Sequence, residues 1–158
     1  NLKAVLNPEP ADVFLISVPT PFKNNKTPDI SYLKNAIEGI APVISSGNLV
    51  IIESTAPVGT TVKIRDWLAN LRSDLNMPGL SENPEINIAH SPERILPGRI
   101  LIELVENDRV IGGLTPNCAE KAASFYGSFV KGICHETNAH TAEIVKLAEK
   151  GNRFESPN

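Results

Sequence analysis

The chain has 158 residues, of which 41% are hydrophobic and 21% are charged, the composition of an ordinary globular domain with a sizeable core. Its net charge of −3 and pI near 5.6 argue against a nucleic-acid-binding or anionic-membrane surface, and no apolar run approaches the roughly 20 residues of a membrane span. Neither the two cysteines, Cys118 and Cys134, nor the three histidines have the spacing of metal ligands. We therefore expect reduced thiols, no metal site and a cytoplasmic location.

The first half of the chain predicts strands that alternate with helices. An apolar run over 11–18 is rich in β-branched and aromatic residues, and Pro19-Thr20-Pro21 ends it because proline cannot donate to a strand ladder. Asp29 can cap the helix that follows, and Pro42 kinks or ends that helix. The expected elements are strands over 3–6, 11–18 and 49–52 and helices over 30–44 and 62–71.

The second half continues the same alternation. Thr115-Pro116 is a good helix start, with a capping hydroxyl before a proline, and Thr141 is expected to cap the last helix. Residues 100–105 fit a short helix or an extended piece. The other expected elements are strands over 86–89, 109–111 and 132–137 and helices over 116–126 and 141–150. This order predicts an α/β fold, a parallel sheet with helices on both faces.

The stretch 53–61, ESTAPVGTT, joins a predicted buried strand to a predicted helix. Two hydroxyls, a proline, a glycine and two more hydroxyls indicate a tight turn at the carboxyl edge of the sheet. Such a turn offers backbone N–H groups and hydroxyls where α/β proteins bind ligands. The sequence has no G-x-G-x-x-G, however, so a dinucleotide site cannot be argued from that fingerprint.

Three successive strands end in polar turns that contain proline, at 19–21, 54–57 and 91–94. In a parallel sheet these turns share one edge, where they could hydrogen-bond a ribose or an amide and position a water. Helix caps and turn prolines are the alternative, but three turns in register favour a ligand site. The side chains expected at this edge are Thr20, Ser54, Thr55, Glu93 and Arg94.

The sequence pattern alone does not decide the roles of two charged residues, Glu93 and Lys146. Two interpretations of Glu93 have equal weight. It is a general base or water-positioning group, or it is a loop carboxylate paired with Arg94 or Arg99. Lys146 lies mid-helix, and a surface pair with Glu143 or Glu149 is the favoured interpretation before any family is considered.

Five motifs in order resemble the nucleotide-sugar dehydrogenases, the UDP-glucose, GDP-mannose and UDP-N-acetylmannosamine 6-dehydrogenases. The resemblance covers about 11–149, and SPER followed by LPG resembles the UDP-N-acetylmannosamine branch most. Pro97 stands where UDP-glucose enzymes carry a second glutamate. The motifs are VPTP at 18–21, ESTAPVGTT at 53–61, SPERILPG at 91–98, DRVIGG at 108–113 and TAEIVKL at 141–147.

The resemblance implies a cofactor, NAD, and an architecture. Residues 1–140 would be the C-terminal half of a Rossmann-type NAD-binding domain, and 141–158 the start of the family's central helix with a divergent tail. The residues implied to bind the cofactor are Val18, Pro19, Thr20, Ser54, Thr55 and Glu93.

The resemblance also implies a reaction, the oxidation of a sugar C6 alcohol to a carboxylate by two NAD+ through an aldehyde and a cysteine thioester. Thr55 would help to place a catalytic water, Glu93 would be the acid or base, and Lys146 would stabilise the developing oxyanion. Glu93, Arg94 and Lys146 would face the UDP-sugar substrate. With the family considered, a functional role for Lys146 becomes the favoured interpretation.

The family's glycine-rich loop and its GGHC-type cysteine motif are not in this sequence, and neither Cys118 nor Cys134 sits in such a motif. We therefore expect a segment of a dehydrogenase that is inactive alone and that forms a homo-oligomer or associates with the parts it lacks. The alternatives are a segment of a UDP-glucose or GDP-mannose dehydrogenase and a non-catalytic half-Rossmann module that associates with another chain.

Overall fold

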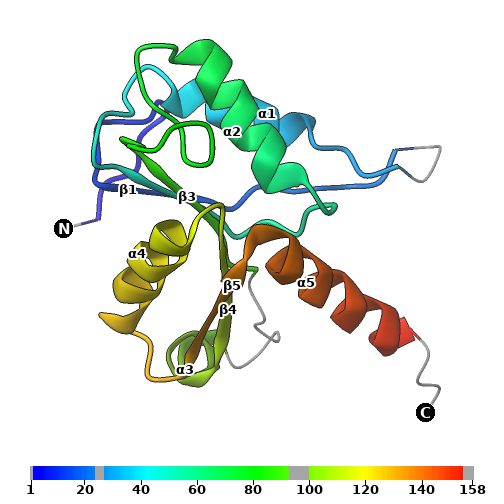
Figure 1. Ribbon diagram of the computed structural model, residues 1–158. Coiled ribbons are helices and arrows are strands. Elements are labelled where there is room, and N and C mark those ends of the chain that lie inside the picture. The colour runs from blue at the N-terminus through cyan, green and yellow to red at the C-terminus, as the bar shows by residue number, and fades with distance from the viewer. Residues whose placement is uncertain (1, 24–26, 93–99, 155–158) are drawn as a thin grey trace.

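The computed structural model describes residues 2–23, 27–92 and 100–154, and within them one sheet of five strands is flanked by five helices (Figure 1). The strands lie in the order of the chain, β1-β2-β3-β4-β5. They are β1 (Val13–Ile16), β2 (Leu49–Ile52), β3 (Asn87–His90), β4 (Arg109–Gly113) and β5 (Cys134–Asn138). The helices are α1 (Ser31–Ile40), α2 (Thr60–Leu71), α3 (Ile100–Glu106), α4 (Pro116–Gly127) and α5 (Ala139–Phe154).

The sheet is parallel except at one pair of strands. β1, β2 and β3 run parallel, and so do β4 and β5, but β3 and β4 are antiparallel and share only two pairs, Ala89 with Gly113 and His90 with Gly112. Figure 1 shows α3 beyond the ends of β4 and β5, so it does not cross the face of the sheet as the helix of a parallel crossover would. The predicted α/β fold is confirmed with a mostly parallel sheet, and the antiparallel pair of β3 and β4 is a departure that the sequence did not predict.

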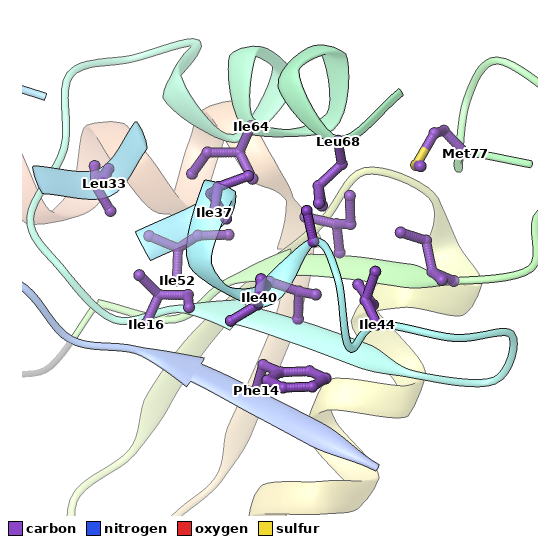
Figure 2. Close-up of a cluster of buried hydrophobic side chains, with 14 of the residues drawn as sticks. Phe14, Ile16, Leu33, Ile37, Ile40, Ile44, Ile52, Ile64, Leu68 and Met77 are labelled. Carbon is purple, nitrogen blue, oxygen red and sulfur yellow. The ribbon is translucent and has the colours of Figure 1, made fainter. Parts of the chain in front are cut away.

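Helices cover both faces of the sheet, as predicted. Below the sheet in Figure 1 lies α4, and above it lie α1 and α2, whose apolar side chains meet those of β1 and β2 in Figure 2. Alternate residues of β2 point to opposite faces, so Val50 and Ile52 join the core under α1 and α2 while Leu49 and Ile51 join the core over α4. A strand buried on both faces is therefore apolar at every position.

Three details differ from the sequence-based expectations. Residues 3–6 form no strand and are exposed. The helix expected over 30–44 ends at Ile40, two residues before Pro42. The last helix is capped by Asn138 and not by Thr141, because the Asn138 Oδ1 accepts the Thr141 N–H at 2.9 Å. In the described part of the chain, no helix is long and apolar enough to span a bilayer.

Candidate functional site

The carboxyl ends of β1, β2 and β3 meet at one edge of the sheet, as predicted. Backbone pairing continues past the strands, since the Glu53 N–H donates to the Ile16 carbonyl at 2.9 Å and the Ser91 N–H donates to the Ile52 carbonyl at 2.9 Å. The polar turns that follow the three strands therefore start side by side. Glu93 and Arg94, two of the predicted site residues, lie outside the described residues.

Ser54 joins the first two turns to each other. Its buried Oγ accepts the Val18 N–H at 2.7 Å and donates to the Val18 carbonyl at 2.8 Å. A second link comes from the Thr20 Oγ1, which donates to the Thr55 carbonyl at 2.6 Å. Two of the three hydroxyls predicted at this edge thus hold the VPTP and STAP turns together, and they give the edge its shape.

Three other predicted residues remain accessible at this edge. Pro19 is exposed, while Val18 and Thr55 are half-buried. Within the part of the chain that the structure describes, the Thr55 hydroxyl makes no hydrogen bond. It is the hydroxyl of this edge that is available to a ligand or a water.

The turn after Thr55 leads into α2 through Gly59, whose φ of 88° is a left-handed conformation that favours glycine. The N–H groups at the first turn of α2, which have no partner within the helix, donate to Glu143 of α5. The Glu143 Oε2 accepts the Gly59 N–H at 2.6 Å, and its Oε1 accepts the Thr61 N–H at 2.8 Å and the Thr61 Oγ1 at 2.6 Å. The carboxylate of Glu143 thus caps α2. The sequence around Thr61 gave no sign of this cap.

Lys146 lies one turn further along α5 than Glu143 and is half-buried. Glu143 is only 1% exposed and faces α2, so it is not the surface partner that one alternative for Lys146 assumed. The side chain of Glu149, the other partner considered, lies outside the described residues. The sequence predicts Glu143 only as a surface partner of Lys146, three residues later in the TAEIVKL motif. Through Glu143, the helix that carries Lys146 is attached to the turn that carries Thr55.

A second polar cluster lies on the α4 side of the same edge. The Tyr126 hydroxyl donates to the Glu53 Oε1 at 2.7 Å, and the Arg109 guanidinium lies 4.5 Å from the centre of the Tyr126 ring. Burial, followed by the nearby Glu53 carboxylate, raises the pKa of Tyr126 well above its usual range. Tyr126 therefore stays a neutral donor, and it holds the first residue after β2 in place.

His90 ends β3 and is fully buried, and neither ring nitrogen has a hydrogen-bond partner among the described residues. Burial lowers the pKa of His90 to about 4, although the Glu143 carboxylate acts in the opposite direction. The imidazole is therefore neutral near pH 7. The spacing of the three histidines argued against a metal site, but the sequence had no signal for the burial of His90.

The family model described as "UDP-glucose/GDP-mannose dehydrogenase family, NAD binding domain" matches residues 2–130. The chain belongs to this family. The resemblance drawn from the five motifs is confirmed, and so is the Rossmann-type fold.

The chain is similar to an NDP-N-acetyl-D-galactosaminuronic acid dehydrogenase of Ralstonia nicotianae, with 54% identity over 153 residues. A UDP-N-acetyl-D-mannosamine dehydrogenase of Escherichia coli K12 is 50% identical over 153 residues. Each alignment covers 96% of this chain and 36% of the relative, so the chain spans about a third of the length of these proteins.

Solved structures of the family have the same fold. A UDP-D-ManNAc dehydrogenase from Pyrococcus horikoshii matches with a TM-score of 0.83 and 48% identity, over 92% of this chain and 33% of that one. The UDP-N-acetyl-mannosamine dehydrogenase Cap5O from Staphylococcus aureus matches with a TM-score of 0.84 and 41% identity, over 96% of this chain and 36% of that one.

The residues of this NAD-binding domain fit a cofactor edge. Linked turns at the carboxyl ends of parallel strands are where open α/β sheets bind their ligands, and the accessible Thr55 hydroxyl lies there. The described residues hold no cluster of three His, Cys, Asp or Glu side chains that could bind a metal ion.

Proposed function

We propose that this chain forms the nicotinamide side of the active site in an NAD-dependent nucleotide-sugar 6-dehydrogenase, and that the substrate is UDP-N-acetylmannosamine. The product would be UDP-N-acetylmannosaminuronate, a precursor for polysaccharide synthesis. The observation that carries the proposal is the pair of turns joined by Ser54 and Thr20, which leaves the Thr55 hydroxyl accessible in a domain of an NAD-binding family.

The reaction converts a CH2OH group to a carboxylate and needs two NAD+ and one water, with two NADH and three protons as the other products. NAD+ supplies the hydride acceptor in both oxidations. In this proposal the Thr55 hydroxyl hydrogen-bonds the attacking water, and Val18, Pro19 and Thr20 form the wall beside the cofactor. Ser54 supports that wall through its bonds to Val18.

The charged residues take the remaining roles. The Lys146 ammonium stabilises negative charge on the sugar oxygen as it develops, an effect that is strong in a site that excludes water. Glu93 acts as the acid or base, and Arg94 faces the UDP-sugar. As a family segment without the GGHC-type motif, the isolated chain is expected to give no turnover.

A second sugar is a serious candidate. The Ralstonia relative named for N-acetyl-galactosaminuronic acid is 54% identical to this chain, against 50% for the Escherichia coli mannosamine enzyme. UDP-N-acetylgalactosamine is therefore the competing substrate. UDP-glucose and GDP-mannose are less favoured, since the solved structures of enzymes for those sugars are 23% and 19% identical.

The test uses a full-length dehydrogenase that carries this segment. NADH absorbance is followed with UDP-N-acetylmannosamine, UDP-N-acetylgalactosamine and UDP-glucose in turn. The proposal expects the mannosamine substrate to give the highest kcat/KM and Lys146→Ala to lower kcat by roughly 100-fold or more. Preference for the galactosamine substrate would overturn the assignment of the sugar, and a Lys146→Ala enzyme with normal kcat would overturn the role of Lys146.

Association without catalysis is the remaining candidate. β1 is the last strand at one side of the described sheet, and a groove of about 610 Å³ runs along it, lined by residues that include Leu6, Phe14 and Ile40. An unpaired strand edge favours pairing with another chain. This candidate predicts oligomers or a complex with a complementary fragment in size-exclusion chromatography with light scattering, and a clean monomer would count against it.

We also propose that the protein acts in the cytoplasm. Both cysteines are free thiols, Cys118 buried and Cys134 half-buried, which fits a reducing compartment. A trapping reagent for thiols, applied to intact cells before lysis, should find both reduced.

A further inference from the structure

Glu143 is a buried carboxylate for which the proposed reaction has no use. It lies on α5, is 1% exposed, and directs both oxygens at the first turn of α2. The contact joins residues more than 80 positions apart in the chain, so it is a tertiary link and not local helix chemistry.

The first turn of α2 satisfies both carboxylate oxygens of Glu143. Three donors, the N–H groups of Gly59 and Thr61 and the Thr61 hydroxyl, satisfy its oxygens. They lie at the N-terminus of a 12-residue helix, where the helix dipole stabilises negative charge. Burial lowers the pKa of His90 to about 4, so the imidazole is neutral at pH 7 and adds no positive charge beside Glu143.

A second contact fixes α5 from the side of the sheet. A Cβ on Gly112 of β4 would lie 2.5 Å from the Asn138 carbonyl oxygen and 2.6 Å from the Ala142 Cβ. The start of α5 is thus pressed onto β4 at Gly112 and bonded to α2 at Glu143. Figure 1 shows the same arrangement, with the first turn of α5 between the sheet and the start of α2.

This double attachment bears on two residues of the proposed site. Thr55 lies four residues before Gly59, in the turn that enters α2, and Lys146 lies one turn after Glu143. Any shift of α5 along α2 would change the distance between Thr55 and Lys146, and misplacement by about 1 Å is enough to slow an enzyme roughly 100-fold.

We propose that Glu143 is a positioning residue, which holds Lys146 in register with Thr55 by binding the N-terminus of α2. The proposal rests on the proposed function, because it takes Lys146 to act on the substrate. Glu143 itself touches neither substrate nor cofactor in this account. Its effect on turnover passes through Lys146.

The experiment measures whether the effect of Glu143 depends on Lys146, in a full-length dehydrogenase that carries this segment. Glu143→Gln keeps the size of the side chain but presents an amide NH2 to one of the N–H donors. Thr61→Val removes only the hydroxyl donor and is the milder variant. Both are made in the wild-type enzyme and in the Lys146→Ala enzyme, and kcat and KM are measured for NAD+ and the UDP-sugar.

We expect Glu143→Gln to lower kcat by roughly 10- to 100-fold while both KM values change less than about threefold. Thr61→Val should act in the same direction with a smaller effect. In the Lys146→Ala enzyme, both substitutions should change kcat by less than about twofold, because the group they position is gone. Glu120→Gln, an exposed glutamate on α4, is the control and should leave kcat unchanged.

Two results separate the possible failures. If Lys146→Ala leaves kcat unchanged, the proposed function of Lys146 is wrong. If Lys146→Ala lowers kcat but Glu143→Gln lowers it equally in both backgrounds, Glu143 acts only on folding or elsewhere, and the positioning role is wrong. Should Glu143→Gln fail to fold, Thr61→Val decides, and a normal kcat in that variant overturns the proposal.

Discussion

The antiparallel pairing of β3 and β4 divides the sheet into a parallel half, β1 to β3, and a reversed half, β4 and β5, and the two halves have different roles. β1, β2 and β3 run parallel and end together in turns that present Thr20, Thr55 and the start of α2 at one edge. β4 and β5 run the other way, and they carry the glycine on which α5 rests and the helix whose Tyr126 holds Glu53. In the proposed function, the parallel half forms the ligand edge and the reversed half positions it.

The reversed half should be the more sensitive to added volume. Gly112→Ala puts a methyl group 2.5 Å from the Asn138 carbonyl and 2.6 Å from the Ala142 Cβ, so α5 must move. We expect the free energy of unfolding to fall by about 3 kcal/mol or more. Gly127→Ala, at a glycine with no atom within 4 Å of the added Cβ, is the matched control and should be neutral or slightly stabilising. Urea denaturation measures the free energy of unfolding of both variants. Equal losses would contradict the claim that α5 packs tightly against Gly112.

His90, at the junction of the two halves, should make stability depend on pH. Its folded pKa of about 4 lies below the ordinary value of 6.5, so the unfolded chain binds the proton first as the pH falls. The contribution of neutral His90 to the free energy of unfolding is complete above pH 6.5 and is lost as the pH falls through 4. The loss is about 3 kcal/mol, since a shift of one pKa unit corresponds to about 1.36 kcal/mol.

The measurement is the free energy of unfolding at pH 7 and at pH 4 for the wild type, His90→Gln and His140→Gln. His90→Gln should lose less stability between these pH values than the wild type does. His140→Gln, at an exposed histidine on α5, is the control for the substitution itself. An unchanged slope in His90→Gln would show that His90 is already protonated or accessible in the folded state.

Much of this arrangement could be predicted from the sequence, because local signals marked it. The strand β2 was predicted with its observed bounds, since its four residues are all apolar and flanked by turn residues. The shared edge followed from three prolines after three strands. The reversal of β4 could not be predicted, because the residues of DRVIGG are compatible with parallel and with antiparallel pairing. The direction of β4 depends on the position of α3, which the local sequence does not contain.

The polar links across the edge were missed for the same kind of reason. Ser54 was predicted as a ligand residue, yet its hydroxyl bonds to Val18, 36 positions earlier. Glu143 and Tyr126 bond to partners 82 and 73 positions away. Contacts over such separations depend on the packing of whole helices, which a pattern within one helix does not contain.

The link through Ser54 should matter for stability in the parallel half. Ser54→Ala removes the acceptor of the half-buried Val18 N–H and the donor to the Val18 carbonyl, and we expect a loss of about 2 kcal/mol in the free energy of unfolding. Ser17→Ala, at an exposed serine on the same turn, should change it by less than about 0.5 kcal/mol. Thermal unfolding compares the two variants. Equal melting temperatures would contradict the structural role of Ser54.

The smallest effect is expected at Tyr126, which connects the halves through Glu53. Tyr126→Phe keeps the ring under Arg109 and removes the only atom among the described residues that donates to the Glu53 Oε1, so about 1 kcal/mol should be lost. Tyr32→Phe, at a tyrosine that is 48% exposed, is the control. A stability difference below the error of denaturant titration would mean that Glu53 does not need this donor.

The central claim, that this chain forms the nicotinamide side of a UDP-N-acetylmannosamine 6-dehydrogenase, is tested most directly by the stoichiometry of its reaction. A full-length dehydrogenase that carries this segment is given limiting UDP-N-acetylmannosamine and excess NAD+, and the NADH formed is counted against the sugar consumed. The account predicts two NADH for each sugar. One NADH for each sugar, or none, would contradict it.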